Sequence, residues 1–309
     1  MDSVRIGTRG SALAMAQAEH VAALLSRFDG GTRVEIETLR VSGGEEGTGA
    51  PRAPIDKRRW VDTIEQALCD GRIDLAVHSA KDVPGQLGDG LALLGAPARA
   101  DAADALCGAL SVSAVPPGGR IGTSSLRRAA QLRAARGDLQ VVTLAGNVDT
   151  RLRRLDEGGL DAIVLAHAGL TRLGREARVD AVLDTRRFVP APGQGTLALE
   201  GRSEDDRARE LARSITDTNA MACLLAERAV ARELGASCQT PLGAHAAPAG
   251  SGRLMLRSWV GLPDGSAWCS DELHGDLGDP GTLGLRSAER LRAAGAAELL
   301  RRAEEMSSV

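Results

Sequence analysis

Short apolar runs alternate along much of the chain with longer stretches of helical periodicity, a pattern typical of parallel sheets covered by helices. In the first part of the sequence it predicts strands over residues 4–8, 34–41 and 73–78 and helices over residues 11–27 and 60–70. After a break rich in Ala, Pro and Arg, the pattern restarts with strands over residues 121–123, 139–144 and 162–166. The chain is therefore predicted to contain two α/β lobes.

The last part of the chain has a different character. Residues 189–195 form a Pro/Gly segment that suits a return crossing, and residues 196–200 are predicted to add a strand to one lobe or the other. The pattern then predicts a helix over 218–234, two or three strands with a turn at 263–266, and a closing helix over 287–305. We expect lobe 1 to comprise residues 1–95, completed by about 192–213, lobe 2 residues 100–189, and a small α+β third domain residues 214–309.

Two stretches that lie far apart in the sequence read almost alike. Residues 6–13 and residues 121–128 each run from an apolar strand through a Gly/Thr/Ser turn into a helix. The first backbone N–H groups of such a helix are unpaired, and with the positive end of the helix dipole they attract anions. Arg9, Arg127 and Arg128 lie at these turns, and guanidinium groups bind carboxylate or phosphate through paired hydrogen bonds. We therefore expect an acidic ligand between two similar lobes.

A third turn has the same character. There Asn147 is predicted to cap a helix that presents Arg151 one turn further on. The formal net charge is −3, so binding of an acidic ligand has to come from local clusters of arginine and not from a basic surface. A nucleic-acid partner is therefore not expected.

Cysteine and histidine usage narrows the class of protein further. The five cysteines have no C-x-x-C spacing, and their odd number and wide separation argue against a disulfide framework. The five histidines are dispersed, so we expect no metal site. No run of about 18 apolar residues occurs, and no leader-like apolar segment opens the sequence. We expect a cytoplasmic protein that does not interact with a membrane.

The run H-S-A-K-D-V-P at residues 78–84 follows a predicted strand, at the edge of a parallel sheet where ligands bind. Taken alone, an Asp before Val-Pro is more often a turn residue than a catalytic one. Beside an electron-rich substrate, however, the Asp82 carboxylate can pass protons and stabilise positive charge. Lys81 and Ser79 can hold ligand carboxylates.

Two further segments each allow two interpretations. A lone cysteine is most often a buried, inert residue, but Cys238 lies in a Gly/Pro loop after a helix, where a thiol of lowered pKa is a good covalent tether. Residues 42–54 are dense in Gly and Pro and are either a solvated surface loop or a mobile lid.

Seven motifs occur in order along nearly the whole chain. They are I-G-T-R-G-S-A-L-A at 6–14, H-S-A-K-D-V-P at 78–84, G-T-S-S-L-R-R at 122–128, G-N-V-D-T-R-L at 146–152, A-G-L-T-R-L-G at 168–174, P-A-P-G-Q-G at 190–195 and S-C-Q-T-P-L-G at 237–243. Together they resemble the hydroxymethylbilane synthase family, also called porphobilinogen deaminases. The resemblance implies two lobes like those of periplasmic binding proteins with a central cleft, plus a third domain that carries the cofactor cysteine.

The resemblance also implies an activity. The family carries a dipyrromethane cofactor as a thioether, here on Cys238, condenses four porphobilinogen units onto it with loss of ammonia, and hydrolyses off the linear tetrapyrrole of the heme pathway. Loss of the amino group leaves an azafulvene-like cation that a carboxylate can stabilise, and Asp82 matches the catalytic aspartate. The implied partner is the small molecule porphobilinogen, and the expected state is a monomer.

The remaining family positions divide into two groups, because each pyrrole carries acetate and propionate and the growing chain needs several carboxylate sites. The positions implied for the cofactor, besides Cys238, are Ser79, Lys81, Thr123, Ser125, Arg127 and Arg128. The positions implied for the substrate are Arg9, Ser11, Arg151, Arg172 and Gln194.

The sequence also departs from the family pattern. Ala145 stands where the family has an arginine before Gly-Asn, the segment around residues 53–60 lacks the usual K-x-G-G-K-G-like run, and D-P-R-D-A has become D-A-A-D-A at 101–105. These departures keep open a diverged paralogue that makes or binds a different or shorter pyrrole oligomer. A plain two-lobed anion-binding protein is a third reading, which retention of Asp82 and Cys238 does not favour.

Overall fold

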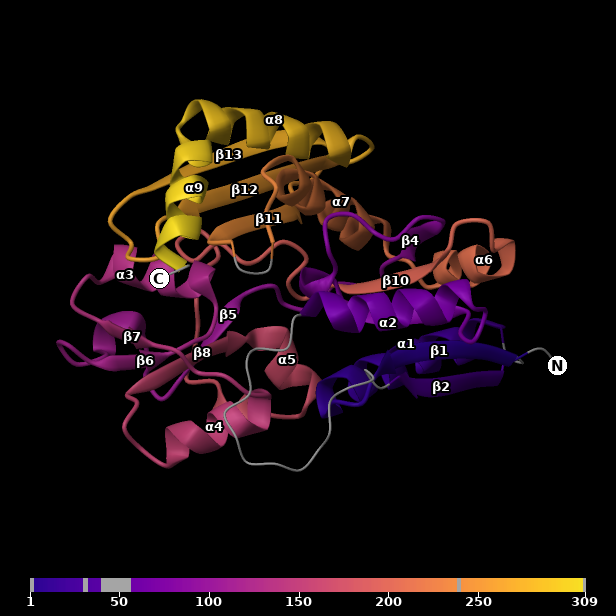
Figure 1. Cartoon of the computed structure of the whole chain (residues 1–309), viewed down its shortest axis with the longest axis horizontal. Helices are drawn as coiled ribbons and strands as arrows, with labels where there is room; N and C mark the ends of the chain where they lie inside the picture. The colour runs from indigo at the N-terminus through magenta and orange to yellow at the C-terminus, as the bar shows by residue number, and fades with distance from the viewer. Residues whose placement is uncertain (1–2, 30–32, 40–56, 238–239, 308–309) are drawn as a thin grey trace.

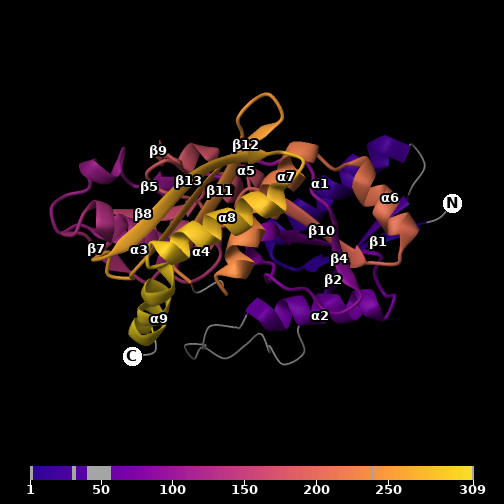
Figure 2. The same ribbon diagram turned by 90° about the horizontal axis from the view of Figure 1, so that it is seen from above.

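A computed structural model describes residues 3–29, 33–39, 57–237 and 240–307. Its strands form two five-stranded sheets and one three-stranded sheet. Figure 1 shows the two larger sheets as separate lobes, with the three-stranded sheet and its helices above both. Figure 2, seen from above, shows this third unit lying across the lobes. The predicted α/β class with two lobes and a small third domain is confirmed.

The sheet of lobe 1 has the strand order β2-β1-β3-β10-β4. Its central strand β1 (Ser3–Arg9) pairs in parallel with β2 (Arg33–Leu39) and β3 (Leu75–Ser79). Strand β10 (Leu197–Arg202) runs antiparallel between β3 and β4 (Leu91–Gly95). The strand predicted over 196–200 therefore belongs to lobe 1.

Helices cover both faces of this sheet. On one face lie α1 (Ala12–Asp29) and α6 (Asp206–Ser214), and on the other lies α2 (Lys57–Cys69). On α1 the spacing of apolar residues by three or four positions puts Val21 and Leu25 on one side, where they are fully buried. Because both faces are covered, a ligand approaches this sheet at the carboxyl ends of its parallel strands.

Lobe 2 repeats the arrangement in the order β7-β6-β8-β5-β9. Strand β6 (Arg120–Gly122) pairs in parallel with β7 (Gln140–Val142) and β8 (Ala162–Ala166). Strand β5 (Asp104–Cys107) runs antiparallel to β8 and to β9 (Ala181–Val182). Strand for strand, order and direction match those of lobe 1, which confirms the two similar lobes expected from the repeated turn.

The helices of lobe 2 again lie on both faces of the sheet. Helix α3 (Leu126–Ala135) contributes Leu132 to one apolar cluster. Helices α4 (Val148–Asp156) and α5 (His167–Arg172) contribute to a second cluster, formed on the other side of the strands.

The third unit is an antiparallel sheet of β11 (Leu242–Pro248), β12 (Arg253–Gly261) and β13 (Trp268–Asp276). The helices packed on it are α7 (Thr218–Glu233), α8 (Pro280–Ala293) and α9 (Ala296–Ser307). The turn between β12 and β13, at the position predicted for it, contacts α3 of lobe 2 through Gly265. The third unit therefore contacts lobe 2 directly.

Some predicted elements are corrected. The single closing helix over 287–305 is wrong, because Gly295 has a φ of +95° and separates α8 from α9 in a conformation that glycine adopts without steric cost. Strands β4, β5 and β9 are absent from the prediction, since these short segments carry no clear alternation. Among the described residues, no helix has the length and apolar content needed to cross a membrane.

Two segments cross between the lobes, residues 96–103 and residues 189–195, and Asp104 and its partners hold these two crossings together. Its carboxylate accepts from Arg127 Nη1 at 2.8 Å and from Arg128 Nε at 2.9 Å, and both guanidinium groups are buried. Arg127 also donates to the Val189 carbonyl, on the return crossing. Burial alone would raise the pKa of Asp104, but the charges and hydrogen bonds of the two arginines hold it well below its usual range.

Glu227 of α7 joins the third unit to both crossings. Its Oε1 accepts from Arg99 Nη1 at 2.7 Å and from the Ala246 N–H of β11 at 2.7 Å. Its Oε2 accepts from the Gly193 N–H at 2.6 Å. Burial would raise the pKa of Glu227, yet Arg99 keeps it below its usual range, so the group is ionised. One buried carboxylate therefore connects the third unit to both segments that join the lobes.

We expect Asp104→Asn to lower the free energy of unfolding by about 3–5 kcal/mol at neutral pH, because it leaves two buried guanidinium groups without their carboxylate. Since the pKa of Asp104 is lowered in the folded protein, its contribution is present above the unfolded-state pKa of about 3.9 and is lost as the pH falls through the folded-state value. The difference from the parent protein therefore narrows below about pH 4. Urea unfolding at several pH values measures it.

Asp156→Asn is the matched control for this experiment. Its carboxylate also pairs with an arginine, Arg178, but on the exposed surface, where such pairs contribute little. A loss at Asp104 no larger than the loss at Asp156 contradicts the role given to the buried cluster.

Candidate active site

The carboxyl ends of β1 and β3 bring three predicted residues to one hollow in lobe 1. Arg9 ends β1, Ser79 ends β3, and Asp82 lies in the 3₁₀ turn Ala80–Asp82 that follows. The same hollow is lined by apolar side chains and by a buried histidine: Ala14, Val61, Ile64, Val77 and His78. Asp82 is therefore placed as expected, at the edge of the sheet beside a cation and next to an apolar surface.

Gln17 is a residue of this hollow that sequence reasoning missed. It lies on α1, is buried, and its Nε2 donates to Ser79 Oγ at 2.8 Å. A polar residue on the buried face of an amphipathic helix is the signal that identifies it. Because Ser79 is held by Gln17, its hydroxyl has a defined position at the edge of the hollow.

All three predicted turns lead into helices, and in each a side-chain oxygen caps the helix. Ser11 Oγ accepts from the third N–H of α1, Ser125 Oγ from that of α3, and Asn147 Oδ1 from that of α4 at 2.8 Å. Each cap therefore occupies a backbone N–H group that the turn pattern suggested for binding a ligand. One of the unpaired backbone donors at each turn is already bonded within the protein.

Arg151 lies in the first turns of α4, in lobe 2. Its Nε donates to the Gly146 carbonyl and its Nη2 to Ser124 Oγ, two neutral partners. Burial and the nearby Arg128 charge lower the pKa of Arg151, and Asp82 acts in the opposite direction. The charges of Asp82 in lobe 1 and of Arg151 in lobe 2 therefore influence each other.

Arg172, at the end of α5, is a second poorly compensated cation. Its Nη2 donates to the Gly195 carbonyl at 2.7 Å, and among residues 3–29, 33–39, 57–237 and 240–307 no carboxylate lies within ion-pair distance. Burial lowers its pKa to about 10, so the group is still charged at neutral pH. A charged group that is half-buried without a counterion favours binding of an anion.

Arg127 and Arg128 are placed differently from what the turn pattern suggests, and Gln194 lies beside them. The side chains of Arg127 and Arg128 are 3% and 7% exposed and bind Asp104, as described above. The Gln194 amide donates to Asp104 at 2.8 Å and to the Ala102 carbonyl, and its Oε1 accepts from Arg128. These residues form the floor of the interlobe joint, and their contact with a ligand stays a prediction.

The structure describes only some of the other predicted site residues. Thr123 is buried, and its Oγ1 accepts from the Ser125 N–H at 3.2 Å. Lys81 lies beside Asp82 in the 3₁₀ turn. Cys238 and the lid candidate at 42–54 lie outside the described residues. Among the residues that are described, no cluster of His, Cys, Asp or Glu is suited to hold a metal ion.

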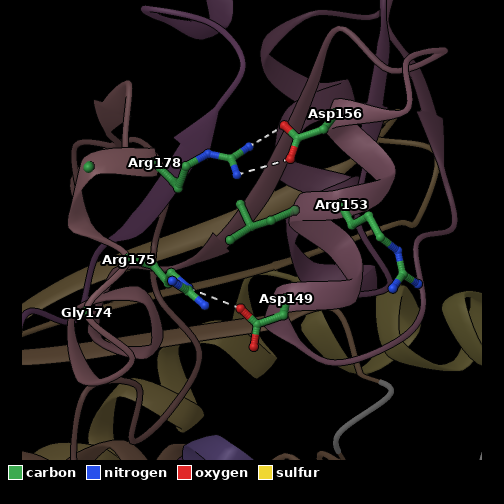
Figure 3. Close-up of a pocket in the computed structure, with 8 residues that line it drawn as sticks. Asp149, Arg153, Asp156, Gly174, Arg175 and Arg178 are labelled. Atoms are coloured by element: carbon green, nitrogen blue, oxygen red, sulfur yellow. Dashed lines mark hydrogen bonds and ion pairs between the residues drawn. The ribbon is translucent and has the colours of Figure 1, made fainter.

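A second hollow, of about 300 Å³, lies on the surface of lobe 2 beside α4. Figure 3 shows Asp149 facing Arg175 and Asp156 facing Arg178 across it. Each of these two carboxylates has its own arginine, so this hollow lacks the uncompensated charge found at Arg172.

Comparison with known proteins gives matches along nearly the whole chain. A family model described as "Porphobilinogen deaminase, dipyromethane cofactor binding domain" matches residues 4–210, and one described as "Porphobilinogen deaminase, C-terminal domain" matches residues 221–293. The porphobilinogen deaminase of Acidithiobacillus ferrooxidans is 46% identical over 300 residues, which cover 96% of this chain and 97% of that protein. That of Xanthomonas oryzae pv. oryzae is 45% identical over 302 residues, which cover 97% and 99%.

Among solved structures, the methionine binding protein MetQ covers 69% of this chain and 89% of its own, with a TM-score of 0.44 and 14% identity. A periplasmic substrate-binding protein of an ABC transporter from Coxiella burnetii covers 69% and 91%, with a TM-score of 0.42 and 16% identity. These likenesses concern the fold alone. The two family models cover both lobes and the third unit, and the residues of the Asp82 hollow lie inside the matched region. The chain therefore belongs to the porphobilinogen deaminase family.

Proposed function

We propose that this enzyme condenses four porphobilinogen molecules, with loss of ammonia, onto a dipyrromethane primer attached to Cys238, and then releases the linear tetrapyrrole by hydrolysis. The observation that carries the proposal is the Asp82 carboxylate in a hollow at the edge of the lobe 1 sheet beside Arg9, together with two half-buried cations of lobe 2, Arg151 and Arg172, that donate to neutral groups. We propose further that it acts as a monomer in the cytoplasm, with lobe 1, lobe 2 and the third domain divided as the sequence predicts.

The cationic walls fit a dipyrromethane group, because every pyrrole of that group carries two carboxylates. Residues of both lobes would hold it: Ser79 and Lys81 from lobe 1, and Arg127, Arg128, Thr123 and Ser125 from the floor and the start of α3. When bound, it supplies the electron-rich pyrrole carbon onto which substrate is added. Arg9, Arg151 and Arg172 would bind the acetate and propionate groups of the incoming porphobilinogen.

Asp82 would act directly on the reacting ring. We infer that its carboxylate, which lines the hollow together with Arg9 and apolar side chains, accepts hydrogen bonds from pyrrole N–H groups. The same negative charge stabilises positive charge that develops on the ring as the amino group leaves. The carboxylate is also placed to take up a proton when the ring regains its aromaticity.

We expect Asp82→Asn to lower kcat by at least about a hundredfold, because the amide keeps the size of the side chain but neither stabilises a cation nor accepts a proton. Consumption of porphobilinogen and formation of tetrapyrrole measure the effect. Asp89→Asn, at an exposed position of the following loop, is the control and should keep the parent rate. An Asn variant within tenfold of the parent would exclude Asp82 as the catalytic carboxylate.

Intact-protein mass spectrometry tests the covalent primer. The purified protein should exceed its sequence mass by one dipyrromethane unit, Cys238→Ser should lose the increment, and Cys69→Ser, at an exposed free cysteine, should keep it. An active protein of unmodified mass contradicts the proposal.

The same measurement separates two candidate functions. Incubation with porphobilinogen should give a ladder of enzyme-bound additions that ends in release of a tetrapyrrole. The replacement of a family arginine by Ala145 favours, as a second candidate, a paralogue that makes a shorter oligomer. A ladder that stops early would support that candidate.

Arg172→Met tests the anion-binding role of the wall. Because a charged hydrogen bond contributes about 1.5–3 kcal/mol, we expect a roughly ten- to hundredfold loss in kcat/KM for porphobilinogen. Arg175→Met removes a nearby exposed arginine, paired with Asp149, and should have little effect. Equal losses of kcat/KM in the two variants would contradict a specific role for Arg172 in substrate binding.

A further inference from the structure

Arg228 of α7, in the third domain, binds the main chain that follows Asp82. Its Nη2 donates to the Pro84 carbonyl at 2.6 Å and to the Gly85 carbonyl at 3.2 Å, and its Nη1 donates to the Val83 carbonyl at 3.3 Å. One guanidinium group therefore joins three successive carbonyls, beginning with the residue directly after Asp82. The planar fork of arginine is suited to this, since its N–H groups point in several fixed directions.

A buried carboxylate in the sheet of lobe 1 supports the charge of Arg228. Burial lowers the pKa of Arg228, and Glu200 of β10 acts in the opposite direction. Glu200 is fully buried, and its Oε2 lies 2.9 Å from Nε2 of His78, which itself lines the Asp82 hollow. Arg228 and Glu200 therefore interact electrostatically, and Glu200 in turn contacts a residue of the hollow that contains Asp82.

The start of the same turn is held from another direction. The Ala80 N–H donates to the Thr196 carbonyl at 3.0 Å. Gly193 lies so close that a Cβ on it would be 2.9 Å from the Ala80 Cβ and 3.0 Å from the Lys81 nitrogen, and its φ of +74° also requires glycine. Glu227, the neighbour of Arg228 on α7, fixes the Gly193 N–H. The turn that carries Asp82 is therefore held at its start by the return crossing and at its end by Arg228.

We propose that Arg228 is a positioning residue for Asp82. It acts through the carbonyls of Val83, Pro84 and Gly85, which set where the Asp82 turn ends, and so holds the carboxylate at the reacting ring. The third domain then contributes to the reaction from behind the crevice, through a contact separate from the loop of Cys238. This inference rests on the function proposed above.

The experiment compares Arg228→Met, Arg228→Lys and Arg232→Met in protein that carries its primer. Arg232 lies one turn further along α7 and is exposed, so its substitution controls for loss of charge on this helix. We expect Arg228→Met to lower kcat ten- to a hundredfold while KM for porphobilinogen changes less than threefold, because the carbonyls it binds position the catalytic carboxylate and not the substrate. Arg228→Lys keeps the charge toward Glu200 but not the fork, so its kcat should be intermediate. Arg232→Met should keep the parent kcat.

A double-mutant cycle with Asp82→Asn gives the decisive readout. If Arg228 acts through Asp82, Arg228→Met should reduce kcat less than threefold in the Asp82→Asn background, although it reduces it at least tenfold in the parent. Equal losses in both backgrounds, or a loss confined to KM, would overturn the proposal. So would failure of both Arg228 variants to fold with primer bound, since the residue would then be structural.

Failure of the proposed function gives a different result. A parent protein that does not consume porphobilinogen, or an Asp82→Asn variant as fast as the parent, refutes that function before any Arg228 variant is compared. An active parent with a slow Asp82→Asn variant and an additive cycle refutes only the positioning role.

Discussion

The structure depends on how a small number of buried carboxylates are shared among many arginines. Asp104 and Glu227 lie at the joint between the lobes, and each binds groups from distant parts of the chain. Taking such charges out of water is costly unless they are paired with good geometry, and here the pairs are closed by hydrogen bonds as short as 2.6–2.9 Å. Among the described residues, the side-chain hydrogen bonds of Arg151 and Arg172 go to neutral groups.

This division of charge explains how an acidic protein can bind a polyanion. The net charge of −3 gives no general attraction, so affinity for an acidic ligand has to come from individual cations, and burial has removed much of the water from Arg151 and Arg172. We propose that carboxylates of a ligand take the place of that lost solvation at Arg151 and Arg172, whereas Asp104 provides the compensating charge for Arg127 and Arg128 within the protein. Arginine therefore has two roles in this protein, and the groups that surround each arginine determine which of the two it has.

Helix α7 gives the third domain a role beyond carrying the cofactor loop. Two consecutive residues, Glu227 and Arg228, reach the crossing at Gly193 and the chain after Asp82. The third domain also contacts lobe 2, because the turn between β12 and β13 lies against α3 and Arg133 of α3 donates to the Pro263 carbonyl at 2.7 Å. Movement of one lobe relative to the other would strain one of these contacts, so the third domain restricts the relative positions of the lobes.

Local sequence predicts much of this protein because its elements have strong local signals. The apolar periods locate most helices and sheet strands, the caps Ser125 and Asn147 mark helix starts, and the repeated turn indicates two similar lobes. Asp82 and Arg9 are placed together by a general rule, since parallel strands end at one edge. The motif order along the chain is sufficient to identify the family.

Other features depend on contacts that no local pattern contains. Strand β10 joins lobe 1, and Arg127 and Arg128 turn toward Asp104, only because segments separated by many residues meet at the crossings. The roles of Gln17, Glu227 and Arg228 follow in the same way from partners on other elements. The sequence by itself determined the elements, the family and the residue types of the site. Only the tertiary structure decided which arginines pair with a carboxylate of the protein and which donate to neutral groups, because that depends on where each carboxylate lies in space.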